Sequence, residues 1–348
     1  MTGMDVSPPG APGTSGPADP DIGPDAGPDI RPDIGPDIGR APSGTQVELR
    51  YGSQSVTVVE VGGGLRCYTA GGRELLDGYQ VGERCTDARG QILAPWPNRL
   101  RDGSYAAGGQ HYQLPLTEPA RRNAIHGLVR WARWSVAEQR EDRAALTYSI
   151  PPQSGWPFTL DLRVDYELGP AGLAVTTTGR NAGPQPCPYG VGSHPYIIAG
   201  AMTIDGLRLR APGARRLLTD DRGIPAGDDP VTGTEYDFRA GVTIGSAALD
   251  TGYRDLERDE DGLAWVVLAD DSSGEATGVW LDQSYPFLML FTGDSLPDPA
   301  RRRRALGVEP MTCAPNALQT EDGLAILQPG DSLVSRWGIT PTPPRPRA

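Results

Sequence analysis

Short stretches of alternating apolar and polar residues recur along the chain from about residue 45 onward. Such an alternation places successive side chains on opposite faces of an extended strand, so that one face can be buried while the other meets water. The first example, QVELRYGSQSVTVVEVGGGLRCYTAGGRELL, breaks at its glycines. Later examples are RAALTYSI, TLDLRVDYEL, GLAVTTTGRN, AMTIDGLRLRA, AWVVLAD, TGVWLDQ, FLMLFTGD and SLVSRWGIT. The pattern predicts many strands of about five to nine residues.

The segments between these stretches carry turn residues, and stretches with a helical period are nearly absent. Strands that follow one another without intervening helices favour antiparallel sheets, because parallel pairs need long crossover connections. We therefore predict an all-β fold, a large antiparallel β-sandwich. No linker-like segment interrupts residues 45–342, which we expect to form one domain followed by a frayed C-terminal tail at residues 343–348.

The N-terminal residues have a different pattern. Residues 20–39 read PDIGPDAGPDIRPDIGPDIG, in which a proline stands at every fourth position. Proline at this spacing excludes a continuous helix and a central strand, and one small apolar residue per unit cannot offset the entropy lost on ordering. Residues 1–44 carry seven aspartates and two arginines. We predict a disordered acidic tail that is dispensable for chemistry, with a partner-binding arm as the alternative.

Composition excludes several classes of function. The 348 residues carry a net charge of -12, so the chain has no basic surface to meet nucleic acid or an anionic membrane. All 32 basic residues are arginines, which excludes Schiff-base lysine chemistry and a P-loop lysine. The one basic run, RRRR at residues 301–304, is interpreted as a solvated loop.

The cysteines and the N-terminal sequence indicate the cellular compartment in which the protein is expected. Cys67, Cys85, Cys187 and Cys313 are widely spaced and form no CxxC pair, which is typical of reduced, isolated thiols. The N-terminus lacks a basic region followed by an apolar run, and no stretch reaches the roughly 20 apolar residues that span a bilayer. We expect a cytoplasmic protein.

Candidate chemistry gathers where glycine and proline interrupt the strand pattern. The stretches concerned are APWPNRLRDGSY (94–105), NAIHGLVRWARW (123–134), PYGVGSHPYI (188–197) and GVEPMTCAPNAL (307–318). They place His126, His194 and Glu309 in constrained turns, where a scaffold often presents working side chains. The third histidine of the chain, His111, follows a turn and is interpreted as structural.

Two imidazoles and a carboxylate support two kinds of chemistry. One is general acid and base catalysis with an assisting hydrogen-bond donor, and the other is a metal site with two histidines and one carboxylate. Neither HxD nor HxxxH occurs in the chain, so the spacing of these residues gives the metal site no support.

Taken together, the motifs resemble those of the aldose 1-epimerases, also called galactose mutarotases, particularly the bacterial branch. The signatures are APWPNRLRDGSY, AIHGLVRWARW, PYGVGSHPYI, LDTGYRDL and VEPMTCAPNA, in the order of the family and within about residues 45–340. The resemblance implies a β-supersandwich with an open cleft for a free sugar. It also implies interconversion of the α and β anomers of an aldohexose such as glucose or galactose, without a cofactor or a metal.

The resemblance further implies roles for the three candidate residues. Glu309 would take the proton from the C1 hydroxyl, and His194 would protonate the ring oxygen. His126 would hydrogen-bond near the ring oxygen and stabilise the developing charge. Because an acid must carry its proton near neutral pH, we expect a neighbouring carboxylate to raise the pKa of His194 modestly.

Sugar contacts are implied for a second group of residues: Asn98, Arg99, Asp250 and Trp131. Trp131 could pack on a sugar face or in the core, and Asp255 competes with Asp250 for its role. Two positions depart from the family pattern. Met289 stands where many members have a glutamine, and Asp294 replaces an asparagine.

The expected partner is therefore a small sugar, with no nucleic acid and no membrane, and the expected state is a monomer or weak homodimer. Two alternatives stay open on the same fold. A hexose-6-phosphate 1-epimerase would need a cluster of cations, which Arg99, Arg130 and Arg133 could supply. A sugar-binding module would have lost catalysis while keeping the cleft.

Overall fold

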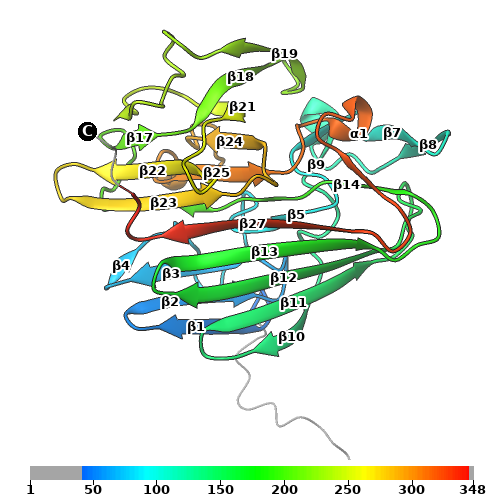
Figure 1. Ribbon diagram of the computed structural model, residues 1–348, viewed down its shortest axis with the longest axis horizontal. Helices are drawn as coiled ribbons and strands as arrows, with labels where there is room; N and C mark the ends of the chain where they lie inside the picture. Colours follow the sequence, from blue (N-terminus) through cyan, green and yellow to red (C-terminus); the bar gives the residue numbers. More distant parts are fainter. Residues whose placement is uncertain (1–40, 345–348) are drawn as a thin grey trace, which may run out of the picture. The chain divides into compact units, whose positions relative to one another are not determined.

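The computed structural model describes residues 41–344, so most of the predicted acidic tail and residues 345–348 lie outside the described part. Within it, strands make up nearly all regular structure (Figure 1). Every pairing in the two large sheets is antiparallel, which confirms the predicted all-β antiparallel fold.

The larger sheet has nine strands. In spatial order they are β10 (Ser135–Gln139), β11 (Arg143–Ile150), β12 (Leu160–Gly169), β13 (Gly172–Asn181), β27 (Ser332–Thr340), β23 (Glu275–Leu281), β22 (Ala264–Asp270), β17 (Arg208–Arg210) and β20 (Val242–Thr243). The last strand before the C-terminal tail, β27, lies between β13 and β23 and so joins the two halves of the sheet (Figure 1).

The second large sheet carries Glu309 and Asp250, and two of its strands flank His194. Its order is β19 (Pro225–Pro230), β18 (Gly213–Thr219), β21 (Asp250–Leu256), β24 (Phe287–Phe291), β25 (Leu306–Met311), β15 (Gly192–Ser193) and β5 (Ile92–Leu93), with β16 (Tyr196–Ile197) also paired to β25.

Smaller units complete the described chain. A four-stranded sheet contains β1 (Gln46–Tyr51), β2 (Gln54–Val59), β3 (Leu65–Ala70) and β4 (Arg73–Glu74). Three strand pairs are β6 (Arg99–Arg101) with β9 (Asn123–Ile125), β7 (Ser104–Ala107) with β8 (Gln110–Gln113), and β14 (Cys187–Tyr189) with β26 (Ala325–Leu327). The helical segments are η1 (Pro119–Arg121), η2 (Pro299–Arg301) and α1 (Ala317–Thr320). None of the helices among residues 41–344 has the length and apolar character needed to cross a membrane.

The strand β12 shows why the alternating pattern folds as it does. Its apolar positions are Leu160, Leu162, Val164, Tyr166 and Leu168, and each is at most 3% exposed. The intervening residues are more accessible, as the period of two requires. Burying a large apolar side chain contributes about 1.5–3 kcal/mol, so one strand of this kind is held firmly against the core.

The sequence pattern located several of the strands and misplaced one stretch. The strands β11, β13, β22 and β27 coincide with predicted stretches. In AMTIDGLRLRA, by contrast, only Arg208–Arg210 is a strand, and residues 201–207 form bends and a turn. The Asp205-Gly206 pair favours a turn, and Ile204 and Leu207 are buried three positions apart, which is not the spacing of a strand face.

The basic run at residues 301–304 is solvated only in part: Arg302 and Arg304 are exposed, but the run is also tied to buried and half-buried carboxylates. Arg301 and Arg304 reach Asp77 with N–O distances of 2.8 and 2.9 Å, and the Asp77 side chain is 2% exposed. Arg303 pairs with Asp294 at 2.8 Å and also with Asp205. A buried carboxylate needs compensating cations, so these arginines tie the loop to the body of the domain.

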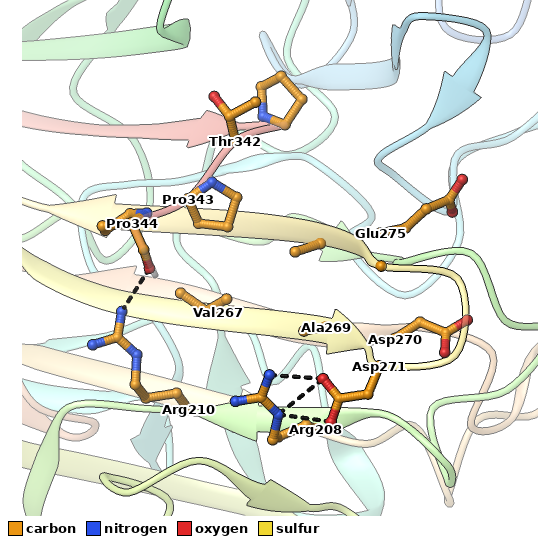
Figure 2. A pocket seen from close by; sticks show the side chains of 13 residues that line it. Arg208, Arg210, Val267, Ala269, Asp270, Asp271, Glu275, Thr342, Pro343 and Pro344 are labelled. Carbon is orange, nitrogen blue, oxygen red and sulfur yellow. Dashed lines mark hydrogen bonds and ion pairs between the residues drawn. The ribbon is translucent and has the colours of Figure 1, made fainter. Parts of the chain in front are cut away.

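A cavity of about 640 Å³ lies between β17, β22, β23 and residues 341–344 (Figure 2). Its arginines already have partners, since Arg208 pairs with Asp271 at 2.7 Å and Arg210 donates to the Pro344 carbonyl. No histidine or cysteine lines it. The residues for acid and base chemistry gather elsewhere.

Candidate active site

Strand register brings His194 and Glu309 together. Two short strands flank His194, and both pair with β25: Gly192 lies opposite Met311, and Tyr196 lies opposite Gly307. His194 lies midway between Gly192 and Tyr196 in the sequence. Glu309 lies midway between Gly307 and Met311 on β25, so it is opposite His194. This places His194 beside Glu309, and their Nε2 and Oε1 atoms are 3.2 Å apart.

His126 reaches the same place from another pair of strands, β6 and β9. Its backbone N–H donates to the Asn98 carbonyl at 3.0 Å, and its Nδ1 accepts from the Asn98 N–H at 3.2 Å. A neutral imidazole that accepts at Nδ1 carries its hydrogen on Nε2. The Asn98 backbone therefore fixes His126 as a hydrogen-bond donor through Nε2.

The backbone at this point is unusual. His126 and Asn98 have φ angles of 63° and 57°, in the left-handed region that side-chain-bearing residues seldom adopt. The next residue, Gly127, has a φ of 69°, and a Cβ there would lie 2.0 Å from the Ala94 carbonyl oxygen. Only glycine fits this close approach. In the HG motif, the backbone conformation therefore requires the glycine, and the histidine supplies the chemistry.

The three candidate residues line one cavity of about 500 Å³. His126, His194 and Glu309 are 7%, 5% and 3% exposed. The two imidazoles meet edge to face with their centroids 5.4 Å apart. Glu309 Oε2 is buried and has no hydrogen-bond partner among the described residues. A buried acceptor without a partner is a natural place for a ligand hydroxyl.

Burial sets the protonation states of these residues. It raises the pKa of Glu309 to about 8, with a further rise from the Asp250 carboxylate. It lowers the pKa of His194 to about 3, and the nearby Arg130 and Arg89 cations act in the same direction. The expected upward shift of the His194 pKa is therefore wrong, because desolvation, the largest effect, outweighs the backbone hydrogen bond that raises this pKa. Near neutral pH the pair holds one proton, and that proton is on Glu309.

A buried stack holds the His194 ring in place. The Tyr196 ring lies parallel to the His194 ring, with a centroid distance of 4.9 Å. The Arg89 guanidinium lies over the Tyr196 ring, 4.4 Å from its centroid. Arg89 in turn pairs with buried Asp77 at 3.2 Å. The stack therefore connects His194 to the ion pairs of the basic run. Tyr196 follows the HP motif directly, but its position behind the imidazole could not be predicted from the sequence.

On the side of Glu309, Arg99 is fixed by two carboxylates. Its Nε donates to Glu118 Oε2 at 3.0 Å, and its Nη1 lies 3.6 Å from Asp250 Oδ2. Arg121 also approaches Asp250, at 4.0 Å. No motif surrounds Glu118, so it could not be recognised from the sequence.

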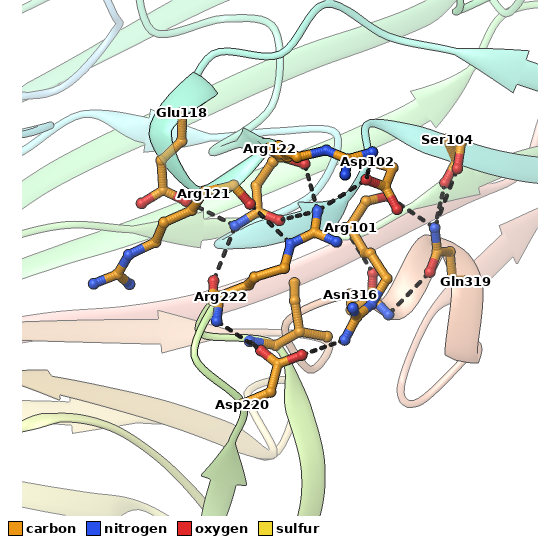
Figure 3. Close-up of polar contacts among 12 residues, drawn as sticks. Arg101, Asp102, Ser104, Glu118, Arg121, Arg122, Asp220, Arg222, Asn316 and Gln319 are labelled. Carbon is orange, nitrogen blue, oxygen red and sulfur yellow. Dashed lines mark hydrogen bonds and ion pairs between the residues drawn. The ribbon is translucent and has the colours of Figure 1, made fainter.

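A wider polar network supports this wall (Figure 3). The Asn123 side chain donates to Glu118 at 2.9 Å and also to the Arg222 carbonyl. Arg222 reaches Asp102 at 3.0 Å, and Gln319 of α1 donates to the Ser104 carbonyl at 2.7 Å. These hydrogen bonds join four segments of the chain, residues 102–104, 118–123, 222 and 319. The network holds Glu118, the partner of Arg99, in place.

Asn98, Arg99, Arg130 and Asp250 line the cavity, whereas Trp131 and Arg133 lie outside it. Trp131 is 53% exposed and lies under Arg84, and Arg133 pairs with Glu60 at 2.8 Å. After Gly127, where the Leu128 N–H bonds to the Ala94 carbonyl, Arg130 is the one residue among 128–134 that lines the cavity. The expected contact of Trp131 with the sugar is therefore wrong, because Trp131 does not line the cavity. Asp255, the competitor of Asp250, lies at a different cavity.

The two departures from the family pattern have structural roles here. Met289 lies opposite Glu309 in the β24–β25 pairing and packs with buried Phe287 and Met311. It puts an apolar side chain beside the carboxyl group, which favours the protonated form. Asp294 pairs with Arg303 and does not line the cavity.

The same three residues meet the distance requirement of a metal site. The ligand atoms of His126, His194 and Glu309 lie within 4.8 Å of one another. However, the carboxyl group is protonated near neutral pH, and the Arg130 cation acts on both imidazoles. A metal ion would have to displace that proton and overcome this repulsion. The donor set therefore fits proton transfer better than metal binding.

Comparison with known proteins agrees with the geometry. The family profile described as Aldose 1-epimerase matches residues 45–340. The uncharacterized protein YihR of Escherichia coli (strain K12) is 31% identical over 289 residues, which cover 83% of this chain and 90% of that protein. The uncharacterized protein YphB of the same strain is 23% identical over 299 residues, 84% of this chain and 97% of that protein.

Two solved structures share the fold. The GalM/aldose epimerase homologue from C. elegans has a TM-score of 0.76 at 18% identity, and the match covers 85% of this chain and 98% of that one. The galactose 1-epimerase from Lactobacillus acidophilus NCFM has a TM-score of 0.71 at 19% identity, covering 84% and 93%. With its profile match over nearly all the described residues, the chain belongs to the aldose 1-epimerase family.

Proposed function

We propose that this protein is an aldose 1-epimerase that interconverts the α and β anomers of aldohexoses by opening and closing the sugar ring. One observation carries the proposal: a buried carboxyl group and imidazole in contact at 3.2 Å in a cavity of about 500 Å³. Ring opening needs one proton removed from the C1 hydroxyl and one delivered to the ring oxygen. A pair that holds one proton supplies both transfers.

The family resemblance assigns Glu309 as the base toward the C1 hydroxyl and His194 as the acid toward the ring oxygen, and the contact between them lets a proton pass from one to the other. Before the sugar reacts, the proton passes from Glu309 to His194, which changes no net charge. The Glu309 carboxylate then takes the C1 hydroxyl proton while His194 protonates the ring oxygen. The open aldehyde rotates about its C1–C2 bond, and both transfers reverse on the other face. Groups acting in this way contribute about 10²–10⁴ in rate.

Neighbouring residues assist without exchanging protons. His126 donates its Nε2–H toward the ring oxygen, where charge develops, and the Asn98 backbone holds it in that tautomer. Arg99 and Asp250 contact sugar hydroxyls. Their 3.6 Å separation is longer than a hydrogen bond, so a hydroxyl can bond to either without breaking a tight pair.

The proposal is tested by dissolving crystalline α-glucose or α-galactose and following the optical rotation with and without the protein. We expect relaxation that accelerates in proportion to protein concentration and persists in EDTA. Loss of the acceleration in EDTA, with recovery on adding a metal ion, would favour the metal site. Specific sugar binding without acceleration would favour the sugar-binding module.

The pH dependence of kcat/KM follows from the pKa of Glu309. The pair is active with one proton, and it loses that proton as the pH rises through about 8. We expect kcat/KM to be level from pH 5 to 7 and to fall about tenfold per pH unit well above 8. Rates are measured from pH 5 to 10 after subtraction of the buffer rate. An activity that declines below pH 6.5 and stays level to pH 10 would contradict the assignment.

A further inference from the structure

After β27, the chain turns across the face of the nine-stranded sheet (Figure 2). In the register of this sheet, Thr340, Gly278, Val267 and Arg210 form one row that crosses β27, β23, β22 and β17. Val267 and Arg210 line the cavity of about 640 Å³ together with residues 341–344. The chain beyond β27 therefore lies along this row.

Two contacts hold residues 341–344 on the sheet. A Cβ on Gly278 would lie 2.6 Å from the Pro343 Cβ, so the glycine makes room for the proline ring. Further along the row, Arg210 donates to the Pro344 carbonyl at 3.5 Å. The contacts pass from β23 to β17, which gives the direction in which the chain continues.

This direction leads into a second cavity, of about 690 Å³, which Pro344 also lines. Its wall carries an acidic turn, residues 259–261 with the sequence DED, and the half-buried Trp265. The Trp265 Nε1 donates to Asp259 at 2.7 Å. The Arg258 guanidinium on the same wall is already engaged, since it donates to three backbone carbonyls. The wall therefore combines an indole with negative charge.

The C-terminal segment, residues 345–348, has the complementary chemistry. It reads RPRA and lies outside the described residues. Prolines at positions 341, 343, 344 and 346 favour the polyproline II conformation, which has three residues per turn. In that conformation Arg347 lies on the same face as Pro344, which lines the second cavity. A guanidinium can both stack on an indole and bind a carboxylate.

We propose that the C-terminal segment of this chain binds in the second cavity, with Arg345 and Arg347 against the acidic turn and Trp265. The occupant follows from the point at which the described chain ends and from the match of two arginines to the acidic wall. A proline-rich segment loses little entropy when an aromatic groove binds it. The bound segment would tie β27 to the loop between β21 and β22. This inference is independent of the proposed function.

The test measures the backbone order parameters of Arg345 and Arg347 by NMR in the full chain labelled with ¹⁵N-arginine. Each signal is assigned with the variant Arg345→Gln or Arg347→Gln. A rigid backbone gives about 0.85, and a flexible one gives less than about 0.6. We expect both arginines above the flexible range in wild type and within it in the double variant Glu260→Gln/Asp261→Asn.

The double variant keeps Asp259, whose side chain accepts the hydrogen bonds that shape the turn. The matched control is Asp255→Asn/Glu257→Gln, which removes two exposed carboxylates from the same stretch of chain but outside the second cavity. It should keep the wild-type values.

Two further conditions separate charge from contact. In about 1 M salt, where the Debye length is about 3 Å, both order parameters of wild type should fall. Gly278→Ala changes no charge but places a methyl group against Pro343, and it should lower the same values. Melting curves establish that the variants fold.

Wild-type order parameters in the flexible range would overturn the proposal. So would values that Glu260→Gln/Asp261→Asn leaves unchanged, or an equal fall in the control, which would make net charge the cause. Order that is lost on dilution would mean that the C-terminal segment of a second copy occupies the cavity, and it would reject binding within one chain.

Discussion

Replacing Glu309 with glutamine is expected to lower kcat for anomer exchange at pH 7 by about 10²–10⁴-fold. Glutamine has nearly the same shape but cannot take up or release the proton. The variant should fold, because the native carboxyl group is protonated near neutral pH and the amide replaces one neutral group with another. The measurement is the relaxation rate of a freshly dissolved anomer at saturating sugar.

A matched control is Glu118→Gln. Glu118 lines the same cavity but bonds to Arg99 rather than to the reacting atoms in the proposed mechanism. We expect this variant to raise KM more than it lowers kcat, because Arg99 loses a fixed partner. If Glu309→Gln keeps more than half of the wild-type kcat, Glu309 does not transfer the proton.

The stability of Glu309→Gln gives an independent check. The pKa of Glu309 is raised from 4.5 to about 8 in the folded protein, so ionisation there opposes folding. The stability contributed by its protonated form is fully present below pH 4.5 and is lost as the pH rises through 8. Relative to wild type, the variant should become progressively more stable between pH 5 and 8.

Replacing His194 with asparagine is expected to lower kcat by a similar factor, about 10²–10⁴. The ring oxygen then lacks its proton donor, although the carboxyl group remains. His111→Asn is the control, since His111 is exposed on the β7–β8 hairpin. Because Glu309 and His194 act as one unit, the double variant should be little slower than either single variant. Losses that multiply would show that the two residues act independently.

The strands were predictable because a buried face imposes a period of two. The domain core follows from it, as the positions of β11, β13 and β27 show. The contact between His194 and Glu309 also follows from strand pairing, but predicting it requires the register of β15, β16 and β25. These short strands leave too little pattern for their register to be read from one sequence.

What the sequence could not provide was the environment of each group. The sign of the pKa shift at His194 depends on burial and on Arg89 and Arg130, which approach it from distant segments. Trp131 and Trp134 lie three residues apart, yet one is exposed and the other is in the core. The run at residues 301–304 looked solvated because its buried partner, Asp77, lies more than 200 positions away in the chain.

The most direct test of the central claim is exchange NMR on a ¹³C1-labelled aldohexose at anomeric equilibrium, with wild type and Glu309→Gln at equal concentrations. At equilibrium, only interconversion of the anomers transfers magnetisation between their C1 signals. Glucose and galactose are each measured at pH 7. The account predicts transfer with at least one sugar that grows with wild-type concentration and falls to the buffer rate with Glu309→Gln. Equal transfer with both proteins, or no transfer above buffer with either sugar, would contradict it.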